Sequence, residues 1–159
     1  MLPSRDDLTD FVHDEARMID EDRFDELLGL WAADNYYSMP LDPDAADPKL
    51  VTALMYEDDY LRKLRGERLE GARTFPQKQR SRYLHVLQRP FADVVDHEAG
   101  HFTTSTPFHY VETRLEEQFL LAATGRHELV IDDGVLRIKL KRVDLLNPDG
   151  AFGNIQLFL

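Results

Sequence analysis

The chain has 159 residues, of which 43% are apolar and 31% are charged, and its formal net charge at pH 7 is −11. This composition is typical of one globular domain spanning residues 1–159, and so acidic a chain is repelled by nucleic acid and by anionic membrane surfaces. Because the sequence contains no cysteine, a disulfide, a thiolate zinc site, an iron–sulfur cluster and a cysteine nucleophile are all excluded.

Two amphipathic helices are predicted at the start of the chain. Ser4 and Asp7 have the spacing of a capping box, which satisfies the free N–H groups of a first helical turn. Apolar residues then recur at helical spacing, namely Leu8, Phe11, Val12, Ala16 and Ile19. A second helix is expected after Asp22, with an apolar stripe formed by Phe24, Leu27, Leu28 and Trp31.

The middle of the chain alternates between short elements and loops. Residues 35–39 read as a strand that Pro40 closes, and residues 42–48 are a loop by composition. A third short helix is expected from Tyr56 through Leu64, ending near Gly66, and residues 71–79 are again loop-like.

The second half of the chain predicts β-structure. Residues 82–95, 102–113 and 118–131 are rich in β-branched and aromatic residues, and the Asp-Gly pair at 133–134 favours a tight hairpin. In the next strand Leu136, Ile138 and Leu140 are expected on one face, with the basic residues Arg137, Lys139 and Lys141 on the other. One face of the sheet is therefore buried, and the other meets water or a partner.

Helices followed by long strands indicate an α+β fold in which the N-terminal helices pack on one face of a curved antiparallel sheet. Such a cone can be filled by side chains or hollowed into a pocket. The longest apolar run, residues 119–123, has five residues, whereas a membrane span needs about 20. No membrane association and no secretion are expected, and the default compartment is the cytoplasm.

The string His97-Glu98-Ala99-Gly100-His101 matches the pattern of zinc proteases. That chemistry requires a helix, because only helical spacing brings both imidazoles to one metal ion. The flanking segments are strand-like, so a hairpin loop is the predicted structure. The remaining histidines lie on separate predicted elements, and no metal site is expected on this chain.

An enzymatic alternative uses the cone as a pocket. A base, a hydrogen-bond donor and a proton shuttle could come from four side chains and would suit an isomerase or dehydratase that acts beside a carbonyl group. The candidate pocket residues are Asp34, Tyr36, His85 and His109. A third possibility is a binding module with an apolar ligand in the cone.

The order of several segments resembles the small (beta) subunits of aromatic-ring-hydroxylating dioxygenases. The similar segments are residues 15–20, 23–28, Trp31, 37–40, 56–59, 80–85, 136–146 and 154–159. The resemblance implies a cystatin-like cone of the nuclear-transport-factor-2 superfamily, and it implies no catalytic residue, cofactor or metal on this chain.

The resemblance also implies a partner. The large (alpha) subunit of this family carries a Rieske iron–sulfur cluster and a mononuclear iron. Most members with a small subunit form mixed hexamers of three alpha and three beta subunits, in which the beta subunits are expected to form a trimeric ring. A reductase supplies electrons from NADH, and dioxygen is added across an arene bond to give a cis-dihydrodiol. A role in assembly is the expected function.

The end of the sequence is unusually apolar. A terminus normally frays, so we expect this one to be held as a last strand or in a subunit interface. The candidate interface residues are Ile155, Leu157, Phe158 and Leu159.

Overall fold

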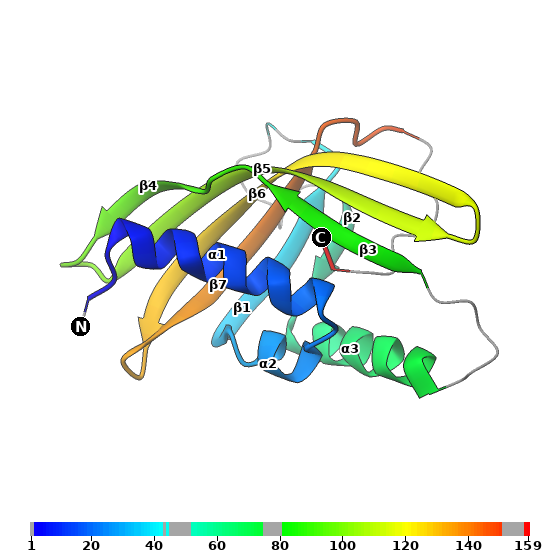
Figure 1. Cartoon of the computed structure of the whole chain (residues 1–159). Coiled ribbons are helices and arrows are strands. Elements are labelled where there is room, and N and C mark those ends of the chain that lie inside the picture. Colours follow the sequence, from blue (N-terminus) through cyan, green and yellow to red (C-terminus); the bar gives the residue numbers. More distant parts are fainter. Residues whose placement is uncertain (1, 43, 45–51, 75–80, 151–157) are drawn as a thin grey trace.

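The structure is a computed structural model that describes residues 2–42, 44, 52–74, 81–150 and 158–159. Three helices and one curved sheet make up the described chain (Figure 1). In chain order the elements are α1 (Arg5–Asp20), α2 (Phe24–Leu28), β1 (Trp31–Pro40), β2 (Ala53–Glu57), α3 (Asp59–Thr74), β3 (Arg82–Leu87), β4 (Phe91–Asp96), β5 (His101–Arg114), β6 (Glu117–Asp132) and β7 (Val135–Leu145).

The first helix begins at the predicted capping box. The Asp7 amide donates to Ser4 Oγ at 3.2 Å, and the Ser4 amide donates to Asp7 Oδ2 at 2.7 Å. The second helix is shorter than predicted, because α2 ends at Leu28 and Trp31 begins β1 instead of continuing the helical stripe. With only five residues, α2 depends on the burial of Phe24 and Leu27 in the core.

The sheet has seven strands in the order β2-β1-β7-β6-β5-β3, and β4 pairs with the other half of β5. Every pairing is antiparallel except that of β1 with β7, which is parallel. The sheet is thus largely antiparallel, as predicted, and this parallel pair is the one that the prediction did not include among the described strands. The pair joins the first and the last strand of the described chain, and local patterning does not encode such a long-range contact.

The segment between β1 and β3 also differs from the prediction. Tyr56 lies in β2 and not in a helix, and its ring packs against that of Tyr36 with centroids 5.4 Å apart. The third helix begins at Asp59 and continues past Gly66 to Thr74, so residues 71–74 are helical instead of loop. Most of the loop predicted at residues 42–48 lies outside the described residues.

The hairpin between β6 and β7 is confirmed. Asp133 and Gly134 have φ angles of 49° and 78°, the left-handed conformation that a tight two-residue turn requires. Further along, Glu128 pairs with Leu140 while Leu129 pairs with Ile138, so Lys139 is an extra residue in β7. Beyond this bulge the residues of β7 that face the core change from even-numbered to odd-numbered positions. Leu140 therefore does not share a face with Ile138, and Lys141 is buried instead of facing solvent.

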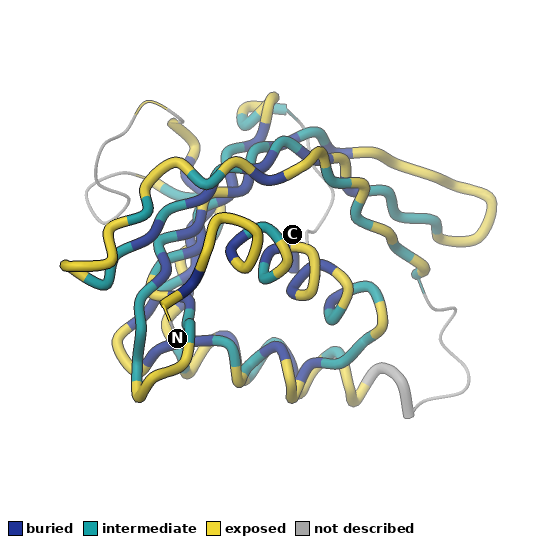
Figure 2. The backbone as a smooth tube through the Cα atoms, turned by 60° about the vertical axis from the view of Figure 1, so that its left-hand side comes forward, coloured by how far each residue is buried: buried dark blue, intermediate teal, exposed yellow. Residues whose placement is uncertain are grey.

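All three helices cover one face of the sheet (Figures 1 and 2), which we call the inner face; the opposite one is the outer face. Helix α1 packs against β3 and β4, and α3 packs against β1 and β2. The core lies between the helices and the inner face and includes Leu8, Ile19, Phe102, Leu129 and Ile138, which are almost completely buried. The predicted α+β architecture with helices on one face of a curved sheet is confirmed.

Candidate functional site

The two faces of the sheet differ in chemistry. Along β5, the even-numbered residues from Phe102 to Tyr110 are buried, while the odd-numbered ones between them are partly or fully exposed. Strand β6 shows the same alternation from Leu121 to Leu129. A candidate site must therefore lie either among the buried polar groups of the cone or on the open outer face.

A buried ionic cluster joins α1 to three strands. Lys141 Nζ lies 2.9 Å from Glu15 Oε1, and His127 Nε2 lies 2.9 Å from Glu15 Oε2. On the other side of the imidazole, Thr104 Oγ1 lies 3.2 Å from His127 Nδ1. Burial alone would raise the pKa of Glu15, but the charges of Lys141 and His127 outweigh that effect and lower it to about 2. Glu15 is thus a carboxylate inside the core, and the cluster can fix the helix on the sheet.

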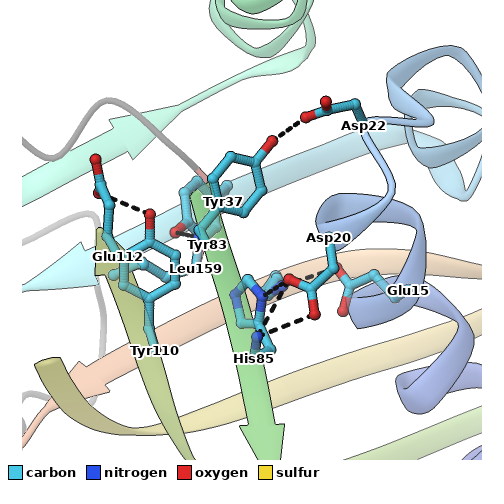
Figure 3. Close-up of polar contacts among 10 residues, drawn as sticks. Glu15, Asp20, Asp22, Tyr37, Tyr83, His85, Tyr110, Glu112 and Leu159 are labelled. Carbon is cyan, nitrogen blue, oxygen red and sulfur yellow. Dashed lines mark hydrogen bonds and ion pairs between the residues drawn. The ribbon is translucent and has the colours of Figure 1, made fainter. Parts of the chain in front are cut away.

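A second polar group in the cone is His85 on β3 (Figure 3). Asp20 Oδ1 lies 2.7 Å from His85 Nδ1, and the Asp20 carboxylate also accepts the His85 backbone N–H at 3.0 and 3.1 Å. This arrangement favours the tautomer with the proton on Nδ1. The other nitrogen, Nε2, is buried and finds no hydrogen-bond partner among the described residues. The ring packs beside those of Tyr110 and Phe108, at 5.2 and 5.8 Å.

The tyrosine hydroxyls near His85 are directed to carboxylates. Tyr83 donates to Asp22, and Tyr110 donates to Glu112 Oε2 at 2.9 Å (Figure 3). Burial, with the nearby charge of Glu112, raises the pKa of Tyr110. Both phenol hydroxyls therefore act as hydrogen-bond donors that hold carboxylates in place.

The four predicted pocket residues do not come together. His85 points into the cone beside Tyr110, its register partner on β5, whereas His109 pairs with Val86 and lies on the outer face. Asp34 is exposed on β1, and Tyr36 packs against Tyr56. Of the four, only His85 is buried and held in one orientation, as a general base would be. Its partner is Asp20, and no pattern in the sequence predicts this contact.

The zinc-protease-like string lies in the predicted hairpin loop. Residues 97–100 form the turn between β4 and β5, and Gly100 has a φ angle of 62°. Asp96 Oδ1 accepts the backbone N–H groups of Glu98 and Ala99 at 3.0 and 2.9 Å, which fixes the turn. Across the described residues, no three His, Asp or Glu side chains gather closely enough to hold a metal ion. No described helix has the length and apolar character needed to cross a membrane.

The last two residues lie in the core of the same chain. The Phe158 ring packs near Phe24 and Tyr37, with centroids 6.2 and 6.3 Å apart, and the Leu159 amide donates to the Tyr37 hydroxyl at 3.3 Å. Phe158 and Leu159 are only 4% and 1% exposed. Ile155 and Leu157 lie outside the described residues, so a role of the tail in a subunit interface stays a prediction.

The outer face carries exposed apolar residues in continuous rows. Leu84, Val111 and Leu120 are direct cross-strand neighbours on β3, β5 and β6, and Val86 and Ala122 flank His109 in the next row. The hairpin of β5 and β6 extends beyond the helices as an arm, residues 111–121 (Figure 1). An apolar surface of this kind fits contact with another protein.

Comparison with known proteins places this architecture in a family. The family model described as "Ring hydroxylating beta subunit" matches residues 14–148. No curated protein matches the sequence.

Solved structures show the same fold. The beta subunit of benzoate 1,2-dioxygenase from Burkholderia mallei superposes with a TM-score of 0.79 at 19% identity, covering 99% of each chain. A chain of naphthalene 1,2-dioxygenase with indole bound in the active site gives 0.77 at 14% identity, covering 98% of this chain and 85% of that one. A hexachlorocyclohexane dehydrochlorinase is more distant, at 0.61 and 13%, covering 87% and 82%. At these identities the likeness concerns the fold.

Proposed function

Because the chain belongs to the ring-hydroxylating beta-subunit family, we propose that it is the non-catalytic subunit of an aromatic-ring-hydroxylating dioxygenase and acts by holding that enzyme together. The observation that carries the proposal is the family match over residues 14–148, most of the chain. It is supported by the buried ionic cluster, which stiffens the cone, and by an apolar outer face suited to protein contact.

The chemistry is assigned to a partner. We propose that a large alpha subunit carries the Rieske cluster and the mononuclear iron, and that three alpha and three beta subunits form the enzyme. Even a Rieske cluster needs two cysteine ligands, and this chain has none. Within the proposal, the alpha subunit uses NADH-derived electrons and dioxygen to cis-dihydroxylate an arene, and the enzyme is cytoplasmic.

A rigid and inert subunit has a physical use in such an enzyme. Electron transfer between neighbouring alpha subunits depends on their spacing, and a ring of beta subunits bound beneath them fixes that spacing through cyclic contacts. The cone is built for stiffness, since its helices are held on the sheet by buried charge pairs as well as by apolar packing.

The test is co-purification. The tagged chain would be expressed together with the alpha subunit encoded in its own genome, and the molar mass and stoichiometry of the captured complex would be measured by light scattering. We expect equal amounts of the two chains in a complex of hexamer mass. A chain that stays separate from the alpha subunit, with both proteins folded, would overturn the proposal.

One observation favours a second candidate, a stand-alone isomerase or dehydratase. The Asp20–His85 pair orients an imidazole whose Nε2 atom is buried without a partner among the described residues. Turnover of a small carbonyl compound by the chain alone, lost in His85→Ala and kept in His109→Ala, would favour this candidate. The proposed scaffold role expects no turnover in either case.

A further inference from the structure

The last two residues of the chain fill a space inside the cone that three other elements line. Phe24 from α2, Tyr37 from β1 and Arg65 from α3 all face the Phe158 ring. Its centroid lies 6.2 Å from that of the Phe24 ring, 6.3 Å from that of the Tyr37 ring and 5.7 Å from the guanidinium carbon of Arg65. The space is therefore built by residues that are distant in sequence from the ones that fill it.

Phe158 and Leu159 are held differently from the rest of the core. Neither residue belongs to a helix or a strand. Among the described residues, the Leu159 amide has one hydrogen-bond partner, the Tyr37 hydroxyl at 3.3 Å. Leu129 is just as deeply buried, but it lies in β6 and pairs with β5 on one side and β7 on the other. The last two residues are thus kept in the core mainly by their side chains, which can leave without breaking the sheet.

The lining of this space combines aromatic walls with two fixed polar groups. The Glu57 carboxylate accepts the Arg65 Nε–H at 3.0 Å, which orients a cation beside the Phe158 ring. Burial raises the pKa of the Tyr37 hydroxyl, so at neutral pH this group keeps its proton and can donate a hydrogen bond as well as accept one. Apolar and aromatic walls with a few convergent polar groups are typical of a site for a small molecule.

Phe158 and Leu159 together make the contacts that a ligand would make there. A flat ring lies beside two aromatic walls and a cation, and an N–H group donates to the Tyr37 hydroxyl. A small aromatic molecule with a hydroxyl or N–H group can reproduce both contacts. Its ring would take the place of the Phe158 ring, and its polar hydrogen would take the place of the Leu159 amide hydrogen.

We propose that this space is a binding site for a small aromatic molecule that carries a hydroxyl or N–H group, and that Phe158 and Leu159 occupy it as an internal ligand. The inference goes beyond the proposed function, because it assigns a ligand to the cone itself, whether or not the chain binds an alpha subunit. A covered site opens through a minor conformation of the protein. The affinity for a ligand is then reduced by the fraction of chains that are open.

The first experiment asks whether the two residues leave the core without global unfolding. Amide hydrogen exchange would be measured by NMR in the wild-type chain for Leu159 and Leu129, which are 1% and 0% exposed. We expect the Leu159 amide to exchange at least about a hundredfold faster, because its local opening breaks no strand pairing. Equal exchange rates would show that Phe158 and Leu159 leave only when the whole chain unfolds, and would overturn the inference.

The second experiment opens the site by substitution and uses phenol and toluene as probes. Phe158→Ala should bind phenol, which is measured as a rise in the midpoint of thermal unfolding. The wild-type chain should bind phenol at least about a hundredfold more weakly, because its own residues fill the site. If Phe158→Ala does not fold, Phe158→Leu removes less volume and takes its place.

Two further variants test the polar contact. In the Phe158→Ala chain, Tyr37→Phe should weaken phenol binding about three- to tenfold, the value of one hydrogen bond, and should leave toluene binding unchanged. Leu129→Ala is the control cavity, because both register partners of this residue, Phe102 and Ile138, are apolar. It should bind toluene in preference to phenol.

Three results of the binding experiment would overturn the inference. One is a folded Phe158→Ala or Phe158→Leu chain that does not bind phenol. Another is equal phenol affinity in the wild-type chain, which would place the phenol elsewhere on the protein. The third is phenol binding that Tyr37→Phe leaves unchanged, or that Leu129→Ala reproduces with the same preference over toluene, because the site would then be an ordinary cavity in the core.

Discussion

The ammonium group of Lys141 lies 2.9 Å from a carboxylate oxygen of Glu15, and the two side chains are only 7% and 2% exposed. Lys141 reaches the interior because the Lys139 bulge turns β7 by one residue, and Glu15 reaches it from the buried side of α1. One irregularity in a strand thus determines how the first helix is attached to the sheet.

Removing one member of this ion pair should lower the free energy of unfolding by more than the intact pair contributes to it. Lys141→Met leaves the Glu15 carboxylate buried with only His127 as a partner, and removal of one member of a buried pair typically costs about 3–5 kcal/mol. Urea unfolding would measure the change in free energy. Lys139→Met is the control, because that side chain is 46% exposed and should shift stability by no more than about 0.5 kcal/mol. Equal effects of the two variants would contradict the role given to the cluster.

Stability should fall at acid pH through Glu15. Its pKa is lowered from 4.5 to about 2 in the folded chain, so its contribution is fully present above pH 4.5 and is lost as the pH falls towards 2. The shift corresponds to about 3 kcal/mol. Glu15→Gln should flatten the part of the pH–stability curve between pH 4.5 and 2. A curve that keeps its full slope in the variant would assign the acid sensitivity to other carboxylates.

Replacement of Arg62 by lysine should lower the stability of the fold. Its guanidinium is fully buried and stacks 3.8 Å above the Trp31 ring, and Asn35 accepts one of its N–H groups. Burial lowers the pKa of Arg62 to about 10, which leaves it charged at neutral pH. Arg62→Lys loses the planar stacking and should cost about 1–3 kcal/mol, whereas Lys63→Ala, at a side chain 58% exposed, should cost little.

The Arg62 change also has a local optical signal. Trp31 is the single tryptophan of the chain, so intrinsic fluorescence reports directly on the ring beneath Arg62. Arg62→Lys should shift the emission spectrum of the folded protein, and Lys63→Ala should leave it unchanged. An unaltered spectrum in Arg62→Lys would contradict the stacked arrangement.

The last residues should contribute to the fold of this chain. Phe158→Ala removes a ring that is 4% exposed and packs near Phe24 and Tyr37, and such truncations cost about 3–5 kcal/mol. Thermal unfolding would measure the loss, with Val135→Ala as an exposed control. Deletion of residues 156–159 should give insoluble protein or a failed complex. Unchanged solubility together with unchanged alpha binding would contradict this.

Local patterns in the sequence predicted the elements that local physics determines. The Ser4–Asp7 capping box placed the start of α1, and the Asp133–Gly134 pair placed the last hairpin, because each needs only neighbouring residues. The strand character around residues 97–101 likewise predicted a hairpin in place of a zinc helix. These features involve no long-range contact.

What the sequence could not predict depends on partners far away in the chain. Burial of Lys141 follows from the strand bulge and from Glu15 on α1, and neither is visible in the alternation of residues 136–141. Trp31 fits the helical stripe equally well, and its pairing with Ile138 on β7 decides that it begins a strand. Asp20 and His85 are 65 positions apart in the sequence, so no local spacing of residues predicts their contact.

The most direct measurement of the central claim is iron content together with arene-dependent oxygen uptake, for the purified chain alone and for its complex with the alpha subunit. An inert scaffold predicts iron, Rieske absorbance and oxygen uptake only in fractions that contain the alpha subunit. Stoichiometric iron in the chain alone, or oxygen uptake by it on addition of an arene, would contradict the account.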